Sequence, residues 1–190
     1  MLYIFLYFNK MVNQQIILLV INTLGGGAVI GSYVLGFINT PNNREVFCGG
    51  VPTWLKPIYT LSMVLSALGY FAFLYFVLFQ LSPEEVKIAD RFGFSLFHVV
   101  FLGILVPSAL WMPLTSAWTA NPSKALWISV RMVLVLVGLF SCVLVWTLLS
   151  LQPRNPGFPF WLAVAGSAYF AFHTAVLDML LWPVLFRTQG

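Results

Sequence analysis

The stretch FSLFHVVFLGILVPSALWMPLTSAW, which spans residues 94–118, contains no Asp, Glu, Lys or Arg. A helix of roughly 20 mostly apolar residues crosses the hydrocarbon core of a bilayer, so this stretch is long enough to span a membrane. Pro107 and Pro113 interrupt it. Because a proline inside a helix removes a hydrogen bond and kinks the helix, we expect the segment to bend near its far end, beside Trp111.

Four further segments have the same length and apolar character: residues 15–37, 56–80, 126–151 and 159–186. Together with residues 94–118 they predict an all-α, multi-pass integral membrane protein, a five-transmembrane-helix bundle that forms a single domain over residues 1–190. Neighbouring helices should be antiparallel, so the two termini should lie on opposite sides of the membrane. We call these sides face A, where the chain begins, and face B, where it ends. The long first loop, residues 38–55, lies on face B.

The composition agrees with a chain that is solvated mainly by lipid. Hydrophobic residues make up 61% of the 190 residues and charged residues only 7%, whereas soluble domains carry about 25% charged residues. The net charge of +4 comes from scattered Lys and Arg, so it does not indicate binding to nucleic acid. Because basic residues are shared almost equally between the two faces, the orientation in the membrane stays open.

Two smaller features belong to face A. Residues 1–8 are apolar but too few for the core of a signal peptide, so we expect an interfacial tail there. After the second segment, Ser82 has the position of an N-cap, with Pro83 at the first helical position and Glu85 three residues on. This capping pattern predicts a short surface helix that continues through Asp90.

Glycines are concentrated in the first segment, at positions 25, 26, 27, 31 and 36. Gly27 and Gly31 have the spacing at which small residues let membrane helices approach closely. We expect a packing seam on this segment, which could also join two copies of the chain as a homodimer. A phosphate-binding loop is excluded, because these glycines neither follow a strand nor open a helix.

Two charged residues lie inside the predicted membrane segments. Arg131 follows the start of the fourth segment, and Asp178 precedes the end of the fifth. At a rise of about 1.5 Å per residue, both lie some 8–12 Å below face B, so we expect an ion pair between them. The pair could be a structural clasp, with Arg131 alternatively reaching the headgroups, or it could line a ligand site.

Aromatic residues gather at the same depth. Trp111 and Trp182 lie deeper than the usual interfacial belt, beside Pro113 and Pro183. We therefore expect an aromatic pocket for a flat apolar small molecule, covered by the first loop. Its expected ligand-binding residues are Trp54, Tyr59, Trp111, Arg131, Asp178 and Trp182.

His173 lies near the midplane of the fifth segment. Its imidazole could be an axial ligand to the metal of a haem or chlorophyll, or it could form a hydrogen bond with a neighbouring helix. His173 and Asp178 are five positions apart in the sequence. In an α-helix this spacing corresponds to a rotation of about 140° around the axis, so we expect the two side chains to face different directions. No pairing of catalytic groups is visible, so we predict no metal site and disfavour an enzyme.

Four short patches resemble the translocator protein / tryptophan-rich sensory protein (TspO) family. Pro52, Trp54 and Pro57 resemble the family's entry to its second helix, and Ala67, Gly69 and Tyr70 resemble its mid-helix small-Gly-Tyr stretch. Ser108, Trp111 and Pro113 are similar to its Asn-x-x-Trp pattern in the third helix. Pro159, Phe160 and Trp161 resemble the aromatic start of its fifth helix. Two differences stand out. Ser108 occupies the place of the family's Asn, and the membrane acid is in the fifth helix rather than the fourth.

The resemblance implies a protein that binds or transports tetrapyrroles, sterols or similar flat apolar ligands. Aromatic walls suit a flat ring, and the guanidinium of Arg131 suits the propionate groups of a tetrapyrrole. The expected partners are therefore membrane lipid and one small apolar ligand, with no certain cofactor. The alternative is a structural or accessory subunit of a larger membrane complex, whose glycine and aromatic faces pack against partner helices.

Overall fold

The computed structural model describes residues 13–39, 50–154 and 156–186. Within them lie five helices long and apolar enough to cross a membrane. They are α2 (Asn13–Asn39), α4 (Lys56–Phe79), α5 (Ser95–Ala120), α6 (Lys124–Leu149) and a fifth helix composed of α7 (Phe158–Ala171), the π-helix η1 (Phe172–Leu181) and α8 (Trp182–Leu185). Every end lies within two residues of its predicted position, so the five-helix multi-pass fold is confirmed. The expected N-terminal tail and loop residues 40–49 lie outside the described residues.

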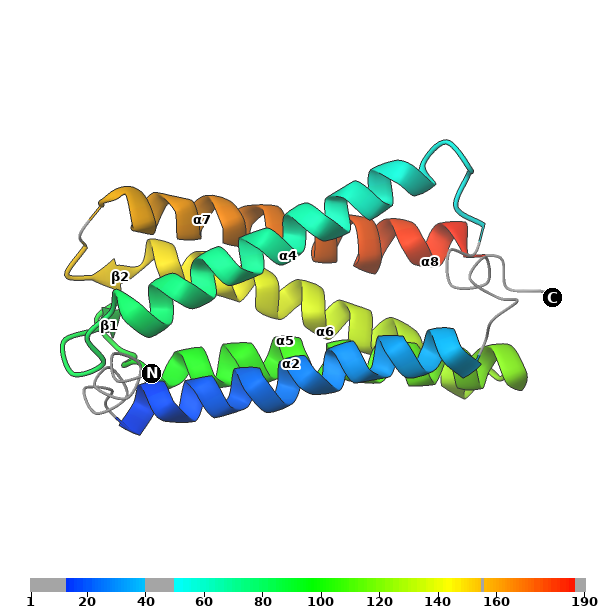
Figure 1. The fold of residues 1–190 in the computed structure, drawn as a ribbon, viewed down its shortest axis with the longest axis horizontal. Helices are drawn as coiled ribbons and strands as arrows, with labels where there is room; N and C mark the ends of the chain where they lie inside the picture. Colours follow the sequence, from blue (N-terminus) through cyan, green and yellow to red (C-terminus); the bar gives the residue numbers. More distant parts are fainter. Residues whose placement is uncertain (1–12, 40–49, 155, 187–190) are drawn as a thin grey trace.

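The helices pack as two groups that α6 joins (Figure 1). Helix α2 lies along α5, and α5 lies along α6, whereas α4 lies along α7. Helix α4 crosses the bundle diagonally, so that its face-B end lies away from α2. Helices α2 and α4 are joined toward face A, where the Gln15 side-chain amide donates to the carbonyl of Leu78 at 2.7 Å. The Tyr70 hydroxyl also donates to Asn22.

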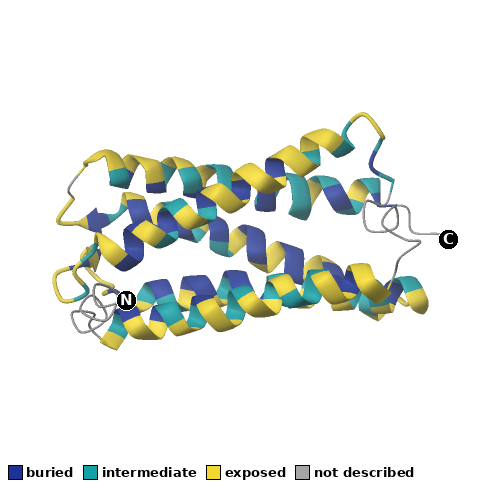
Figure 2. Ribbon diagram, viewed as in Figure 1, coloured by how far each residue is buried: buried dark blue, intermediate teal, exposed yellow. Residues whose placement is uncertain are grey.

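Buried residues occur along the whole length of the bundle (Figure 2), but the clusters that they form differ between its two halves. The half toward face A is filled by a core of closely packed phenylalanines that are almost fully buried: Phe73, Phe94, Phe97, Phe101 and Phe160. A second, smaller cluster lies at face B and consists of Val51, Trp118, Val130, Leu134, Trp182 and Phe186. The space between these two clusters is where a site can form.

Helices α4 and α7 cross at a pair of glycines. A Cβ atom added to Gly69 would lie 2.5 Å from the carbonyl oxygen of Gly166, and one added to Gly166 would lie 2.8 Å from that of Gly69. Only residues without a side chain permit such a close approach, which gives membrane helices extensive van der Waals contact. This crossing fixes the position of α4, and therefore of the side chains that α4 presents toward α7.

The predicted glycine seam on the first helix is present only in part. Gly25 packs against Leu105 and Gly36 against Met112, where added Cβ atoms would lie 2.8 and 2.5 Å from side-chain atoms of α5. Gly27 has no such neighbour within 4 Å among the described residues, and the same is true of Gly31. The seam on α5 therefore uses other glycines than the pair that the spacing had indicated.

The prediction of a short surface helix that continues through Asp90 is wrong. Ser82 accepts hydrogen bonds from the backbone amides of Glu85 and Val86, but only this single turn forms. The chain then enters β1 (Lys87–Ile88), which pairs antiparallel with β2 (Leu151–Gln152). Ala89 and Asp90 have φ angles of 51° and 56°, which a right-handed helix does not contain. Burial of Ile88 and its strand pairing outweigh the local capping pattern.

Candidate functional site

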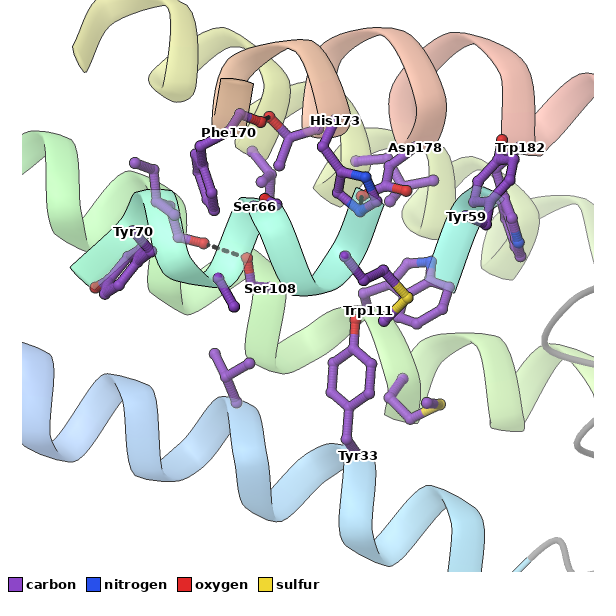
Figure 3. A pocket seen from close by; sticks show the side chains of 18 of the residues that line it. Tyr33, Tyr59, Ser66, Tyr70, Ser108, Trp111, Phe170, His173, Asp178 and Trp182 are labelled. Atoms are coloured by element: carbon purple, nitrogen blue, oxygen red, sulfur yellow. Dashed lines mark hydrogen bonds and ion pairs between the residues drawn. The ribbon is translucent and has the colours of Figure 1, made fainter. Parts of the chain in front are cut away.

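A cavity of about 480 Å³ lies in the half of the bundle toward face B (Figure 3). Small-molecule sites in proteins have volumes of about 300–1,000 Å³ and mostly apolar walls. All five long helices contribute to this cavity, and Val51, in the described end of the first loop, contributes to its face-B side. Its aromatic wall consists of Tyr33, Phe37, Tyr59, Tyr70, Phe71, Trp111, Phe170 and Trp182.

Ring contacts hold this wall in place. The ring of Trp111 lies 5.6 Å from that of Tyr33 and 5.5 Å from that of Trp182, the latter in an edge-to-face arrangement. Such contacts stabilise aromatic pairs beyond the area that they bury. The indole Nε1 of Trp111 is buried and has no hydrogen-bond partner among the residues that the structure describes. Buried indole N–H groups usually have an acceptor, so this donor is an exception among the described residues.

Four of the six predicted ligand-binding residues line this cavity: Tyr59, Trp111, Asp178 and Trp182. Trp54 does not, because it lies in the loop before α4 with 70% of its surface exposed. Arg131 is also exposed and outside the cavity wall. On α6 the inward positions are those of Val130, Leu134 and Val137, and Arg131 lies about 100° around the helix from Val130.

The predicted ion pair between Arg131 and Asp178 is not formed, although both residues lie in the described part of the chain. Asp178 is instead paired with His173, whose Nε2 lies 3.5 Å from Oδ2 of the carboxyl group. We expected these two side chains to face different directions, and that expectation is wrong. Residues 172–181 form a π-helix, in which hydrogen bonds join residues five apart rather than four. Residues 173 and 178 therefore lie on the same face of the segment.

A chain of hydrogen bonds continues from His173 to helix α4. Nδ1 of His173 lies 2.9 Å from the hydroxyl oxygen of Ser62, and the Tyr169 hydroxyl donates to that same oxygen at 3.2 Å. Because Ser62 accepts from Tyr169, its own hydrogen can point to Nδ1. Nδ1 then accepts, and Nε2 carries the hydrogen that points to Asp178. The chain thus orients a neutral imidazole toward the carboxyl group.

The order Ser62, His173, Asp178 resembles a catalytic triad, but the position of Ser62 does not suit a nucleophile. Ser62 is buried between α4 and the fifth helix and is outside the cavity wall, whereas a nucleophile must reach its substrate. His173 and Asp178 do line the cavity. Both ring nitrogens of His173 are engaged, so axial ligation of a metal would break one of these contacts. Across residues 13–39, 50–154 and 156–186, no group of three His, Cys, Asp or Glu residues could hold a metal ion.

The cavity opens sideways between α2 and α4. Three of its lining residues, Ile30 on α2 and Met63 and Phe71 on α4, are 67%, 46% and 64% exposed. Because exposed side chains of both helices line the cavity and the face-B half of α4 lies away from α2 (Figure 1), the cavity reaches the outer surface between them. Ile30 and Met63 lie about 10–14 Å along their helices from the face-B ends, at a rise of 1.5 Å per residue. This opening therefore faces the hydrocarbon layer of the membrane.

Sequence reasoning missed several residues of the site. Tyr33 extends from α2 toward Trp111, and Tyr70 and Phe170 form the end of the cavity nearest to face A (Figure 3). Tyr33 lies at the depth of the predicted pocket, so depth alone could have included it. Ser62 has no signal of its own in the sequence, because a serine in a membrane helix is usually bonded to its own helix.

Comparisons of the chain with protein-family models, with curated proteins and with solved structures find no match. The resemblance to the TspO family therefore stays a prediction, which rests on its four short patches.

Proposed function

We propose that this membrane protein binds or transports a flat apolar small molecule, of tetrapyrrole or sterol type, in the cavity between α2, α4, α5, α6 and η1. The observation that carries the proposal is a 480 Å³ cavity with aromatic walls that opens toward the lipid. A ligand of this kind partitions into the hydrocarbon layer, so a sideways opening gives it a direct path. The kinship with the TspO family belongs to the same proposal.

The polar groups of the cavity suit a ligand with few polar atoms. The N–H of Trp111 has no acceptor among the described residues and can donate to a hydroxyl, a carbonyl or a carboxylate of the ligand once the indole turns toward the cavity. Arg131 cannot serve the propionates of a tetrapyrrole from its outward position, whereas Lys56 lines the cavity near face B and can approach them. Flat rings can stack against the aromatic wall that includes Tyr33, Trp111 and Trp182, where stacking adds to the hydrophobic effect.

Quenching of tryptophan fluorescence tests the proposal, because Trp111 and Trp182 lie in the wall. Protein in lipid nanodiscs is titrated with protoporphyrin and, separately, with a sterol that carries a quenching group. We expect saturable quenching that Ala67→Phe, which fills the cavity from α4, weakens at least tenfold. Trp54→Phe serves as the control, since Trp54 lies outside the cavity. Equal affinity of Ala67→Phe and the wild type would overturn the proposal.

A second candidate, a subunit that packs against other helices, is favoured by the exposure of α2. Only 11% of the residues in its most apolar window are buried, against 39–44% in the other four membrane helices. Gly27 and Gly31 have open space beside them among the described residues. Native mass spectrometry from detergent tests this candidate: a dimer that Gly27→Leu dissociates supports a homodimer through α2. A monomer for both proteins, with binding intact, favours the ligand-binding function alone.

A further inference from the structure

Asp178 is the one acidic residue in the five membrane helices, since the other four acids of the chain lie in its connections: Glu45, Glu84, Glu85 and Asp90. An ionisable group at this depth is costly to keep and usually serves a function. The carboxyl group lines the cavity, and 33% of its side-chain surface is accessible there. A molecule in the cavity can therefore touch it directly.

The surroundings leave room for a positive partner. The chain from Tyr169 through Ser62 can hold His173 as a neutral imidazole, which offers Asp178 one N–H over 3.5 Å but no full charge. Arg131, the cation we expected here, points outward. The other titratable groups that face the cavity are Tyr33 on α2 and Lys56, Tyr59 and Tyr70 on α4; the lining residues of α5, α6 and α7 contribute none.

Aromatic rings line the same cavity as this carboxyl group. Tyr33 and Tyr59 line this cavity together with Asp178. Trp111 and Trp182 contact each other in the same wall, with ring centroids 5.5 Å apart. The faces of such rings attract cations, and aromatic cages are the usual site for quaternary ammonium groups. Aromatic walls and a carboxylate in one cavity favour a positive group over a neutral one.

We propose that Asp178, with Tyr33, Tyr59, Trp111 and Trp182, forms a subsite for an organic cation, a protonated amine or quaternary ammonium group attached to a flat apolar body. The inference rests on the proposed function, because the apolar body occupies the same cavity. It narrows the ligand class from apolar molecules in general to amphiphilic cations. A proton and an organic cation then compete for one carboxylate, so the affinity for the cation rises with pH.

A matched pair of probes tests this subsite: (2-naphthylmethyl)trimethylammonium and its neutral isostere 2-neopentylnaphthalene, in which carbon replaces nitrogen. Saturable binding is measured by calorimetry in nanodiscs of zwitterionic lipid. We expect Asp178→Asn to weaken binding of the cation at least tenfold and to change binding of the isostere less than twofold. Glu84→Gln makes the same chemical change at an exposed position on face A and should alter neither.

The outcomes separate the two proposals. Binding of the isostere that equals binding of the cation, or cation binding that Asp178→Asn leaves unchanged, overturns the cation subsite while the apolar site stands. Absence of binding for both probes in folded wild-type protein overturns the proposed function as well. Should Asp178→Asn fail to fold, the pH profile of the wild type decides: the affinity for the cation must rise with pH while that for the isostere stays flat, and two flat profiles refute the inference.

Discussion

Replacing Gly69 by alanine should force α4 and α7 apart. The new Cβ would lie 2.5 Å from the carbonyl oxygen of Gly166 and 3.0 Å from its Cα. Ordinary contacts between such atoms are about 3.5 Å, so the helices must separate by about 1 Å. The atoms that clash belong to the backbone and cannot rotate away as a side chain can. Relief therefore has to come from movement of a whole helix.

Overpacking of this kind costs about 1–3 kcal/mol, and we expect Gly69→Ala to lower the free energy of unfolding by that amount. Gly27→Ala is the matched control. It makes the same change in a membrane helix, at a position with nothing within 4 Å among the described residues. Removing a glycine from a helix interior favours the helix by up to roughly 1 kcal/mol, so the control should be neutral or slightly stabilised.

Reversible unfolding in mixed micelles of dodecylmaltoside and SDS, followed by circular dichroism, measures both free energies. Combining Gly69→Ala with Gly166→Ala adds a second test, because a helix moved by the first substitution has already made part of the room for the second. The double variant should therefore lose less than the sum of the two single losses. A Gly69→Ala protein as stable as Gly27→Ala would refute the close crossing of α4 and α7.

Three further variants test smaller parts of the structure. Tyr70→Phe removes the hydroxyl that donates to Asn22 between α4 and α2, and should lower the free energy of unfolding by about 0.5–1.5 kcal/mol in the same micelles; unchanged stability would contradict a role for this bond. Tyr59→Phe removes the donor that reaches the Leu177 carbonyl of η1 at 3.0 Å. Amide hydrogen exchange within η1 should then become faster, and equal exchange would count against the bond. Met63→Trp at the sideways opening should slow ligand association, measured by stopped-flow fluorescence, and equal rates would place the entrance elsewhere.

The sequence was sufficient to predict the five helices, because their length and apolar character reflect the thickness of the membrane. Depth could be read in the same way, by counting residues from each helix end. That count correctly brought Tyr59, Trp111, Asp178 and Trp182 into one cavity. It also explains why Tyr33 was within reach of the same reasoning.

Rotation about the helix axis could not be read from the sequence. In lipid both faces of a helix are apolar, so periodicity gives little information on which face points inward. Arg131 was therefore placed at the correct depth but on the wrong side of α6. The pairing of His173 with Asp178 failed for a related reason, since an α-helical repeat was assumed where a π-helix forms. The short strand β1 depends on β2, more than 60 residues away in the chain, and no local pattern shows this.

Photolabelling tests the central claim, a ligand site inside the bundle, most directly. A naphthalene that carries a diazirine is photolysed with the protein in nanodiscs, and the labelled residues are identified by mass spectrometry. A ligand site inside the bundle predicts labels on cavity residues such as Met63 and Tyr70, which excess unlabelled ligand and Ala67→Phe both remove. Labels spread over outward residues such as Leu24 and Val184, and unchanged by either treatment, would contradict it.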